Sequence, residues 1–249
     1  MKLSRRTDTW TLPPAVTRLV VLGDPHGDLA GLEQVVVAEQ GPTTAFVSVG
    51  DNVGYADGPQ SSRFLARLAE LGVRSVYGNH EDWATLDGRL FLVEPRGADR
   101  QLSPAAIAWC EALPARLDVV FASAPGWRVR VAHTDLGKGV EPEWPFMNDA
   151  LVASFPADEG VDLVLFGHSH GAAIYRIDAA GAVTSTRLSL TGAERQAVRL
   201  DFGASFAVDA GSLGRPGYHP HPTRRGLGTY AVVDAVGRTV MLVAIDKVG

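Results

Sequence analysis

Side chains that can bind metal ions recur at the ends of apolar segments along this chain. Asp24 and Asp51 each follow a short apolar run that ends in glycine. Of the seven histidines, five stand at or just after the end of a predicted strand, namely His26, His80, His133, His168 and His170. Histidines distributed only for packing would not gather at strand ends, so this placement indicates a shared chemical role.

The spacing of these residues suggests how they are paired. Asp24 and His26 are two residues apart, as are His168 and His170, and in extended chain each pair projects to one side. Each pair is therefore expected to grip one ion. Oxygen and imidazole ligands without thiolate suit Mn, Fe, Co, Ni or Zn and argue against a structural zinc site. The single cysteine, Cys110, excludes an internal disulfide and a thiolate cluster.

The segments before these residues alternate between strand-like and helix-like patterns. Short apolar, β-branched runs lead into polar loops, and helix-like stretches follow. This order predicts βαβ units, in which ligands sit beyond the carboxyl ends of parallel strands. The predicted strands of this part are 18–23, 45–50 and 74–78, and the predicted helices are 29–39 and 61–71.

The rest of the chain is predicted to be richer in strands. A helix is expected over 102–113, with Ser103 as its N-cap. Gly-rich turns divide the last third into short runs typical of antiparallel structure. The predicted strands are 117–122, 127–133, 163–170, 174–178, 183–190, 205–211, 229–235 and 239–245. Together these elements predict an α/β fold, a four-layer α/β/β/α sandwich with mixed sheets.

Composition limits the organisation and the partners. The 249 residues are 46% hydrophobic, enough for a single domain over 1–249 that buries about 70 to 75% of its unfolded surface, with residues 1–17 as an N-terminal extension. A net charge of −5 disfavours a long nucleic-acid partner. Because there is no signal-peptide pattern and no apolar run of membrane-spanning length, we expect a cytoplasmic protein without membrane contact. The sequence does not indicate an oligomeric state.

The metal-capable residues form an ordered set of motifs that resembles a known family. GDPHGD, GDNVGYADG, GNHE, Ala132-His133 and GHSH are similar to the motifs of the calcineurin-like metallophosphoesterases, over residues 18 to about 215. The resemblance implies two divalent metal ions, with Mn favoured, and a role for each residue. One ion would be held by Asp24, His26 and His170, the other by Asn79, His133 and His168, with Asp51 bridging both. His80 would contact the phosphate and protonate the leaving oxygen.

Such a site has a clear chemical purpose. Two divalent cations and two ligand carboxylates leave it near +2, which supplies the positive pocket that the overall charge lacks. Water bound to a metal ionises near neutral pH, so an attacking hydroxide becomes available, and paired ions stabilise both the attacking and the leaving oxygen. The expected function is phosphoester hydrolysis of a small phosphorylated substrate.

The motifs also bear on the branch of the family. Where protein phosphatases and dinucleoside tetraphosphatases have Asp and Arg in GDxVDRG, this chain has Gly54 and Tyr55. Its other motifs look more like those of the small bacterial phosphodiesterases, although Thr134-Asp135-Leu136 replaces their usual Gly-Ser-Pro. Phosphodiester hydrolysis is the preferred hypothesis, with cyclic or small nucleotides as candidate substrates. Phosphomonoesterase or Ser/Thr-type protein phosphatase activity is the alternative, and a non-catalytic metal-bound scaffold is a remote one.

Two loops are candidates for shaping the substrate. Residues 134–147 offer Trp144 and Phe146, which would either stack on a nucleobase or close the core. Residues 214–226 carry Arg215, which would either bind phosphate or lie in a solvated turn. The candidate substrate contacts are thus Arg215, Trp144 and Tyr55. Glu81 and Asp82 are interpreted as an acidic pair at a helix start rather than as supports of the metal ligands.

Overall fold

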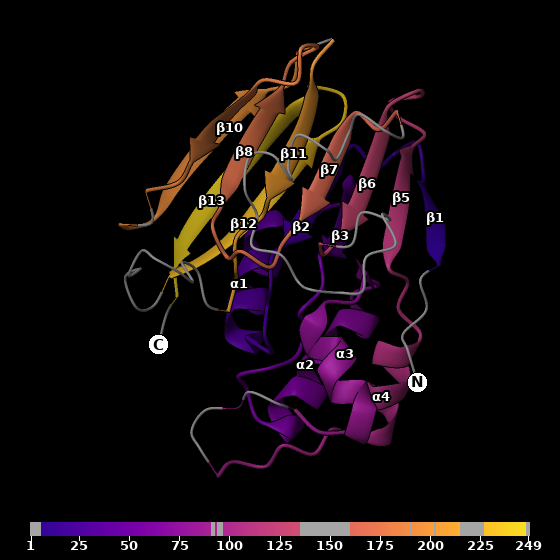
Figure 1. The fold of residues 1–249 in the computed structure, drawn as a ribbon, viewed down its shortest axis with the longest axis vertical. Helices are drawn as coiled ribbons and strands as arrows, with labels where there is room; N and C mark the ends of the chain where they lie inside the picture. Colours follow the sequence, from indigo (N-terminus) through magenta and orange to yellow (C-terminus); the bar gives the residue numbers. More distant parts are fainter. Residues whose placement is uncertain are drawn as a thin grey trace.

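Two mixed β-sheets form the body of the protein in a computed structural model (Figure 1), which describes residues 6–90, 93, 97–134, 160–189, 191–201, 203–214 and 227–247. Within these ranges, the first sheet has seven strands in the order β1 (Thr7–Leu12), β5 (Arg116–Phe121), β6 (Arg128–Ala132), β7 (Leu163–Phe166), β11 (Ser205–Asp209), β8 (Ala173–Ile177) and β9 (Val183–Arg187). The second has six described strands in the order β10 (Glu194–Arg199), β13 (Thr239–Asp246), β12 (Leu227–Asp234), β2 (Arg18–Leu22), β3 (Thr44–Ser48) and β4 (Arg74–Ser75).

The strands bury both faces because their apolar residues alternate in direction. In β2, Leu19 and Val21 enter the core between the two sheets, whereas Val20 and Leu22 enter the core beneath the helices. In β7, Leu163 shares the inter-sheet core, while Phe166 joins a third cluster on the far face of the seven-stranded sheet. Continuous apolar runs such as RLVVL are therefore required, because both sides of these strands are covered.

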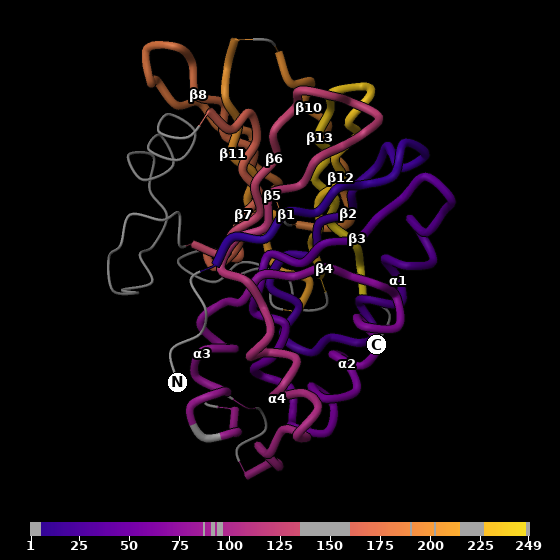
Figure 2. The backbone as a smooth tube through the Cα atoms, turned by 90° about the vertical axis from the view of Figure 1, so that its right-hand side faces the viewer, coloured from indigo at the N-terminus to yellow at the C-terminus, as the bar shows by residue number. Residues whose placement is uncertain are grey.

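The four described helices pack against the six-stranded sheet. They are α1 (Leu29–Glu39), α2 (Gly58–Glu70), α3 (Asn79–Asp87) and α4 (Pro104–Glu111). In Figures 1 and 2, α2, α3 and α4 are grouped below the strands, and α1 lies closer to the sheet. The hydroxyl of Ser103 accepts from the backbone N–H of Ala106, which confirms the predicted N-cap of α4. Asp28 and Asp57 cap α1 and α2 in the same way.

The predicted fold class is confirmed: the chain is an α/β protein built on two mixed sheets, each with parallel and antiparallel pairs. The second helical layer of the predicted four-layer sandwich has no member among the described residues. Nor is any described helix both long and apolar enough to cross a membrane.

Two edge strands were absent from the sequence prediction. Residues 7–12, placed in an N-terminal extension, form β1 and pair in parallel with β5. Residues 194–199 form β10 on β13. Both strands have exposed, polar positions, so their sequences carry little of the apolar signal that identifies a buried strand.

A buried polar cluster fixes the end of α1 to the sheet. The carboxylate of Glu39, at the last position of α1, accepts from the hydroxyl of Tyr230 at 2.8 Å and from the guanidinium of Arg18 at 2.7 Å. Glu39 and Tyr230 are buried, and burial raises the pKa of Tyr230. The phenol of Tyr230 therefore keeps its proton and donates it in the hydrogen bond to the carboxylate of Glu39.

We expect Tyr230→Phe to lower the free energy of unfolding by roughly 2 kcal/mol, because a buried carboxylate loses a donor. Urea denaturation of the variant measures this loss. Tyr175→Phe is the matched control, since its hydroxyl bonds Arg187 nearer the surface, and it should cost less. Equal losses in the two variants would contradict a special role for the Glu39 cluster.

Candidate metal centre

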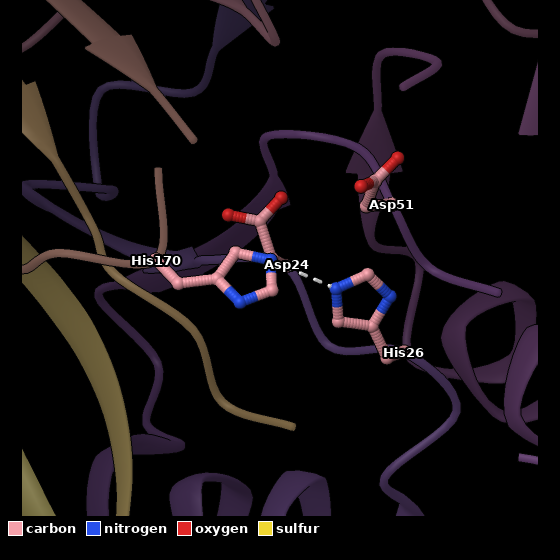
Figure 3. A group of neighbouring side chains, drawn as sticks. All are labelled: Asp24, His26, Asp51 and His170. Atoms are coloured by element: carbon pink, nitrogen blue, oxygen red, sulfur yellow. Dashed lines mark hydrogen bonds between the residues drawn. The ribbon is translucent and has the colours of Figure 1, made fainter. Parts of the chain in front are cut away.

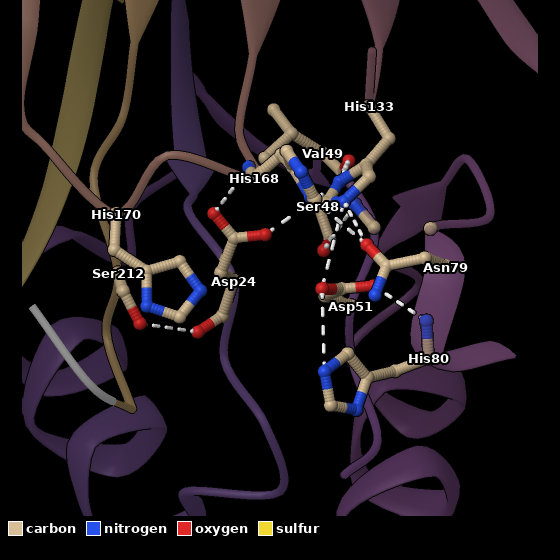
Figure 4. A network of polar contacts seen from close by, with 12 residues as sticks. Asp24, Ser48, Val49, Asp51, Asn79, His80, His133, His168, His170 and Ser212 are labelled. Atoms are coloured by element: carbon tan, nitrogen blue, oxygen red, sulfur yellow. Dashed lines mark hydrogen bonds and ion pairs between the residues drawn. The ribbon is translucent and has the colours of Figure 1, made fainter. Parts of the chain in front are cut away.

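The seven predicted metal ligands and His80 come together at one place, where the carboxyl ends of five strands meet. β2, β3 and β4 are parallel neighbours in one sheet, and β6 and β7 are parallel neighbours in the other. The loops that follow these strands turn toward a shared centre (Figure 4). Asp24 and His26 follow β2, Asp51 follows β3, His133 follows β6, and His168 and His170 follow β7, while Asn79 and His80 are the first residues of α3 after β4.

The side chains form two groups that share one carboxylate. In the first group, Asp24, His26, Asp51 and His170 each offer one atom, and these atoms lie within 4.8 Å of one another (Figure 3). Asp51, His133 and His168 satisfy the same criterion in the second group.

The amide oxygen of Asn79 extends the second group. Its Oδ1 lies 3.2 Å from Nε2 of His133 and 2.9 Å from Nδ1 of His168. The two groups could therefore each hold an ion, with Asp51 between them.

One spacing argument is wrong. His168 and His170 do not grip the same ion site, because they belong to different groups. Their φ angles are +73° and +58°, so the chain between them is not extended, and a two-residue spacing does not place both side chains on one side. The division implied by the family resemblance agrees with the two groups. Of the two pairs inferred from extended geometry, Asp24 and His26 share a group, whereas His168 and His170 do not.

Hydrogen bonds to backbone carbonyl oxygens determine which ring nitrogen carries a proton in two histidines. Nδ1 of His26 lies 3.1 Å from the carbonyl oxygen of Val53, and Nδ1 of His133 lies 2.9 Å from that of Val49. A carbonyl oxygen only accepts, so both Nδ1 atoms carry protons. Each Nε2 therefore points into the centre, where the neutral ring would offer its lone pair to a metal ion.

The residues present fit bound cations. Oδ1 of Asp24 is buried and has no hydrogen-bond partner, while Oδ2 accepts from the backbone N–H of His168 at 2.8 Å. The Nε2 atoms of His26 and His170 face each other at 3.0 Å. A cation would satisfy the unpaired oxygen and both imidazole lone pairs at once.

The electrostatics of the protein groups point the same way. Burial, and then the carboxylates of Asp51 and Asp209, raise the pKa of Asp24 well above its usual range, although His133 opposes this. Burial lowers the pKa of His26, with His80 and His170 adding to the effect. Burial also opposes a charge on His133, but Asp51 raises its pKa to about 9. Divalent cations would favour the ionised carboxylates and the neutral imidazoles that ligation needs.

Glu81 supports the loop that carries Asp51, and the sequence interpretation of this residue was incomplete. Glu81 does lie in the first turn of α3, as expected of an acidic pair at a helix start. It is also fully buried, and its carboxylate accepts from the backbone N–H groups of Asp51, Asn52, Val53 and Gly78 at 2.6 to 3.3 Å. Burial, and then Asp51, raise its pKa to about 7, while these N–H groups favour the carboxylate.

His80 lies against the second group without belonging to it. Its backbone N–H donates to Oδ1 of Asp51 at 2.9 Å, and its Nε2 lies 3.9 Å from Oδ2 of the same residue. A Cβ on Gly54 would collide with Nδ1 of His80, and Gly54 has a φ of +99°. The glycine that replaces the aspartate of the protein-phosphatase motif thus gives the histidine ring its space. Tyr55 follows, with its ring 5.2 Å from that of His80 and 4.6 Å from that of His26.

Three residues that the sequence analysis did not single out hold the remaining loops. Ser169, between His168 and His170, donates to the carboxylate of Asp209, which also accepts from the N–H of Gly211 at 2.8 Å. The hydroxyl of Ser212 donates to the carbonyl oxygen of Asp24 at 2.7 Å. Asp209 and Ser212 belong to the sequence Asp209-Ala210-Gly211-Ser212 at the end of β11.

The other candidate substrate contacts lie outside the described residues. Trp144, Phe146 and Arg215 belong to the ranges 135–159 and 215–226, so their predicted roles stay predictions. Of the proposed substrate contacts, Tyr55 is the one that the structure places at the centre.

The sequence matches the family model of the calcineurin-like phosphoesterases over residues 17–172, so the chain belongs to this family. The matched range contains every predicted metal ligand and His80. The predicted enzyme class, a hydrolase of phosphoester bonds, is therefore confirmed. The family depends on two metal ions, and the two groups of side chains agree with that requirement. No curated protein matches the sequence.

Several solved structures have a similar arrangement over most of the chain. One, provisionally described as a diadenosine tetraphosphatase, has a TM-score of 0.46 and 17% identity and covers 96% of this chain and 98% of its own. An uncharacterized protein from Streptococcus pneumoniae TIGR4, described as a predicted phosphoesterase, has a TM-score of 0.40 and 15% identity, and the match covers 89% of this chain and 91% of its own. A protein serine/threonine phosphatase from Saccharomyces cerevisiae, described as similar to human phosphatase PP5, has a TM-score of 0.49 and 14% identity, and the match covers 100% of this chain and 85% of its own. Values this low say nothing about the substrate.

We expect Glu81→Gln to weaken Mn²⁺ binding about tenfold or more, because the amide cannot accept from all the N–H groups that position Asp51. Isothermal titration with Mn²⁺ measures the change. Asp82→Asn is the matched control, since it removes an acidic group from the same helix turn, and it should bind Mn²⁺ normally. Equal weakening in both variants would show that charge at the helix start is sufficient and that the contacts of Glu81 are not needed.

Proposed function

We propose that this chain hydrolyses small phosphodiesters with two divalent metal ions. The observation that supports this most strongly is the position of Asp51, which belongs to both groups of metal-capable side chains and lies beside His80. In this proposal Asp51 would be shared by the two ions. Asp24, His26 and His170 would hold one ion, and Asn79, His133 and His168 would hold the other.

The ions, when bound, would polarise the phosphate oxygens and make an ionised water available near neutral pH. The protein residues then fix the geometry of the reaction. Glu81 orients the Asp51 loop through its four backbone contacts. The ring of His80 lies between Gly54 and Asp51, and in this proposal it would face the leaving oxygen of the phosphate.

The proton balance assigns a role to His80. As the water oxygen bonds to phosphorus, the bond from phosphorus to the leaving oxygen breaks, and the leaving oxygen needs a proton. His80 is placed to donate it, so that the leaving group departs as a neutral alcohol. Without this proton an alkoxide would have to leave, which is slow for alkyl groups and tolerable for nitrophenolate.

Tyr55 favours a diester over a monoester. A phosphomonoester carries nearly two negative charges at neutral pH and a diester carries one. At position 55 this chain has a neutral tyrosine in place of the arginine that the protein-phosphatase motif offers. This position therefore adds no charge for the second anionic oxygen of a monoester, which supports the diester proposal over the phosphatase alternative.

Asp51→Asn should abolish Mn²⁺-restored hydrolysis of bis-p-nitrophenyl phosphate after chelation, because a shared carboxylate is lost. In the wild type we expect a higher kcat/KM for this diester than for p-nitrophenyl phosphate. Asp57→Asn, which alters a helix cap in the same loop, is the control and should remain active. Full activity of Asp51→Asn would refute the bridging role, and a preference for the monoester would favour the phosphatase alternative.

His80→Ala should leave the Mn²⁺ stoichiometry unchanged and lower kcat, because His80 is proposed as an acid and not as a ligand. The loss should be on the order of 10² to 10⁴ for alkyl phosphodiesters. It should be much smaller for nitrophenyl esters, whose leaving oxygen needs no proton. Equal losses on both kinds of substrate would instead assign His80 to binding.

A further inference from the structure

A cavity of about 970 Å³ lies beside α3, one helical turn beyond His80. Trp83 and Leu86 of α3 form part of its lining, together with Arg89, Leu90 and the segment 97–100. Its volume is at the upper end of the range for small-molecule sites, and such sites combine apolar walls with a few polar groups. None of its lining residues was singled out by the motifs.

Trp83 connects this cavity to the centre. Its ring lies 4.9 Å from the ring of His80, centroid to centroid, and the same tryptophan lines the cavity. His80, Trp83 and Leu86 follow one another at three-residue spacing along α3. With a rise of 1.5 Å per residue, Leu86 lies about 9 Å along the helix from His80. A group attached to the phosphate next to His80 would therefore reach the cavity within the length of a nucleoside.

The lining offers an apolar surface and a positive charge. Leu86 is 67% exposed, which is unusual for a leucine, and it adjoins the half-buried Trp83. Among the described lining residues, the charged side chains are those of Arg89, Asp99 and Arg100. Their formal charges sum to +1, in a protein whose net charge is −5.

Backbone hydrogen bonds fix the segments that carry the two arginines. Arg89 forms an antiparallel bridge with Gln101, and the N–H of Leu90 donates to the carbonyl oxygen of Arg100 at 3.0 Å. The N–H of Leu102 donates to the carbonyl oxygen of Gly88 at 3.2 Å. This short ladder begins where α3 ends, so the arginines are tied to the helix that carries His80 and Trp83.

We propose that this cavity binds the leaving group of the substrate, and that this group carries an aromatic ring and a second anionic group. The inference rests on the proposed function, because His80 as proton donor places the leaving oxygen on the side of Trp83. The ring of the leaving group packs on Trp83 and Leu86. Its anionic group, a phosphate, pairs with Arg89 and Arg100. A nucleotide has both features.

The test compares two dinucleotides that differ by one terminal phosphate on the leaving nucleoside, with the products identifying which nucleoside leaves. In the wild-type holoenzyme, removal of this phosphate should raise KM roughly tenfold. In Arg89→Ala/Arg100→Ala, the two dinucleotides should have the same KM. A matched control, Arg63→Ala/Arg199→Ala, removes two exposed arginines outside the cavity and should behave like the wild type. The role of Trp83 is tested in the same way. Removal of the base from the leaving nucleoside should raise KM in the wild type and should leave KM unchanged in Trp83→Leu.

Hydrolysis of bis-p-nitrophenyl phosphate separates this inference from the proposed function. If every variant hydrolyses that diester and the phosphate effect is the same in the wild type and in Arg89→Ala/Arg100→Ala, the cavity assignment is wrong while the proposed function stands. If the wild type hydrolyses no diester, the proposed function is wrong. Isothermal titration with the same two dinucleotides then tests the cavity assignment separately. If the wild type binds the phosphorylated dinucleotide about tenfold more tightly and Arg89→Ala/Arg100→Ala binds both equally, the assignment is supported. If the wild type binds both equally, the assignment is wrong.

Discussion

The burial of several carboxyl groups at one point is the constraint on which the rest of the structure depends. Asp24, Asp51, Glu81 and Asp209 are all buried, and each of them interacts electrostatically with His133. Burial raises the pKa of Asp24, Glu81 and Asp209, so each ionised form is costly in the folded protein. Hydrogen bonds from backbone N–H groups offset part of this cost, and divalent cations at the two groups would offset much of the remainder.

The same constraint explains where the backbone is strained. Seven described non-glycine residues have positive φ angles, and six of them lie in the loops of the centre: Asp24, His26, Asp51, Tyr55, His168 and His170. Such conformations cost of order 1 to 3 kcal/mol each and persist only where surrounding contacts impose them. Here the contacts are visible. Glu81 holds the Asp51 loop, Ser212 holds the carbonyl of Asp24, and Asp209 holds Ser169.

The sequence predicted most of the elements, and the residues that would gather at one centre, because both depend on local patterns. The helix over 29–39 has its buried residues at helical spacing, and the polar loops follow buried strands, so both signals were strong. Polar edge strands such as β10 have no comparable pattern. The role of Glu81 also could not be derived from spacing, since its partners Asp51 and Asn52 lie some thirty positions earlier in the chain. The pairing of His168 and His170 was misjudged from spacing because φ angles are not visible in a sequence.

A metal centre of this kind does not choose its substrate alone, because paired cations stabilise the charge of any phosphoester. Discrimination must come from side chains around the phosphate, and α3 and the Asp51 loop supply several. Tyr55 and Trp83 both contact the ring of His80, at centroid distances of 5.2 and 4.9 Å. The residue proposed to protonate the leaving group is thus in direct contact with the aromatic residues best placed to recognise it. Changes at position 55 or 83 would then alter substrate preference while the carboxylates and imidazoles of the centre stay as they are.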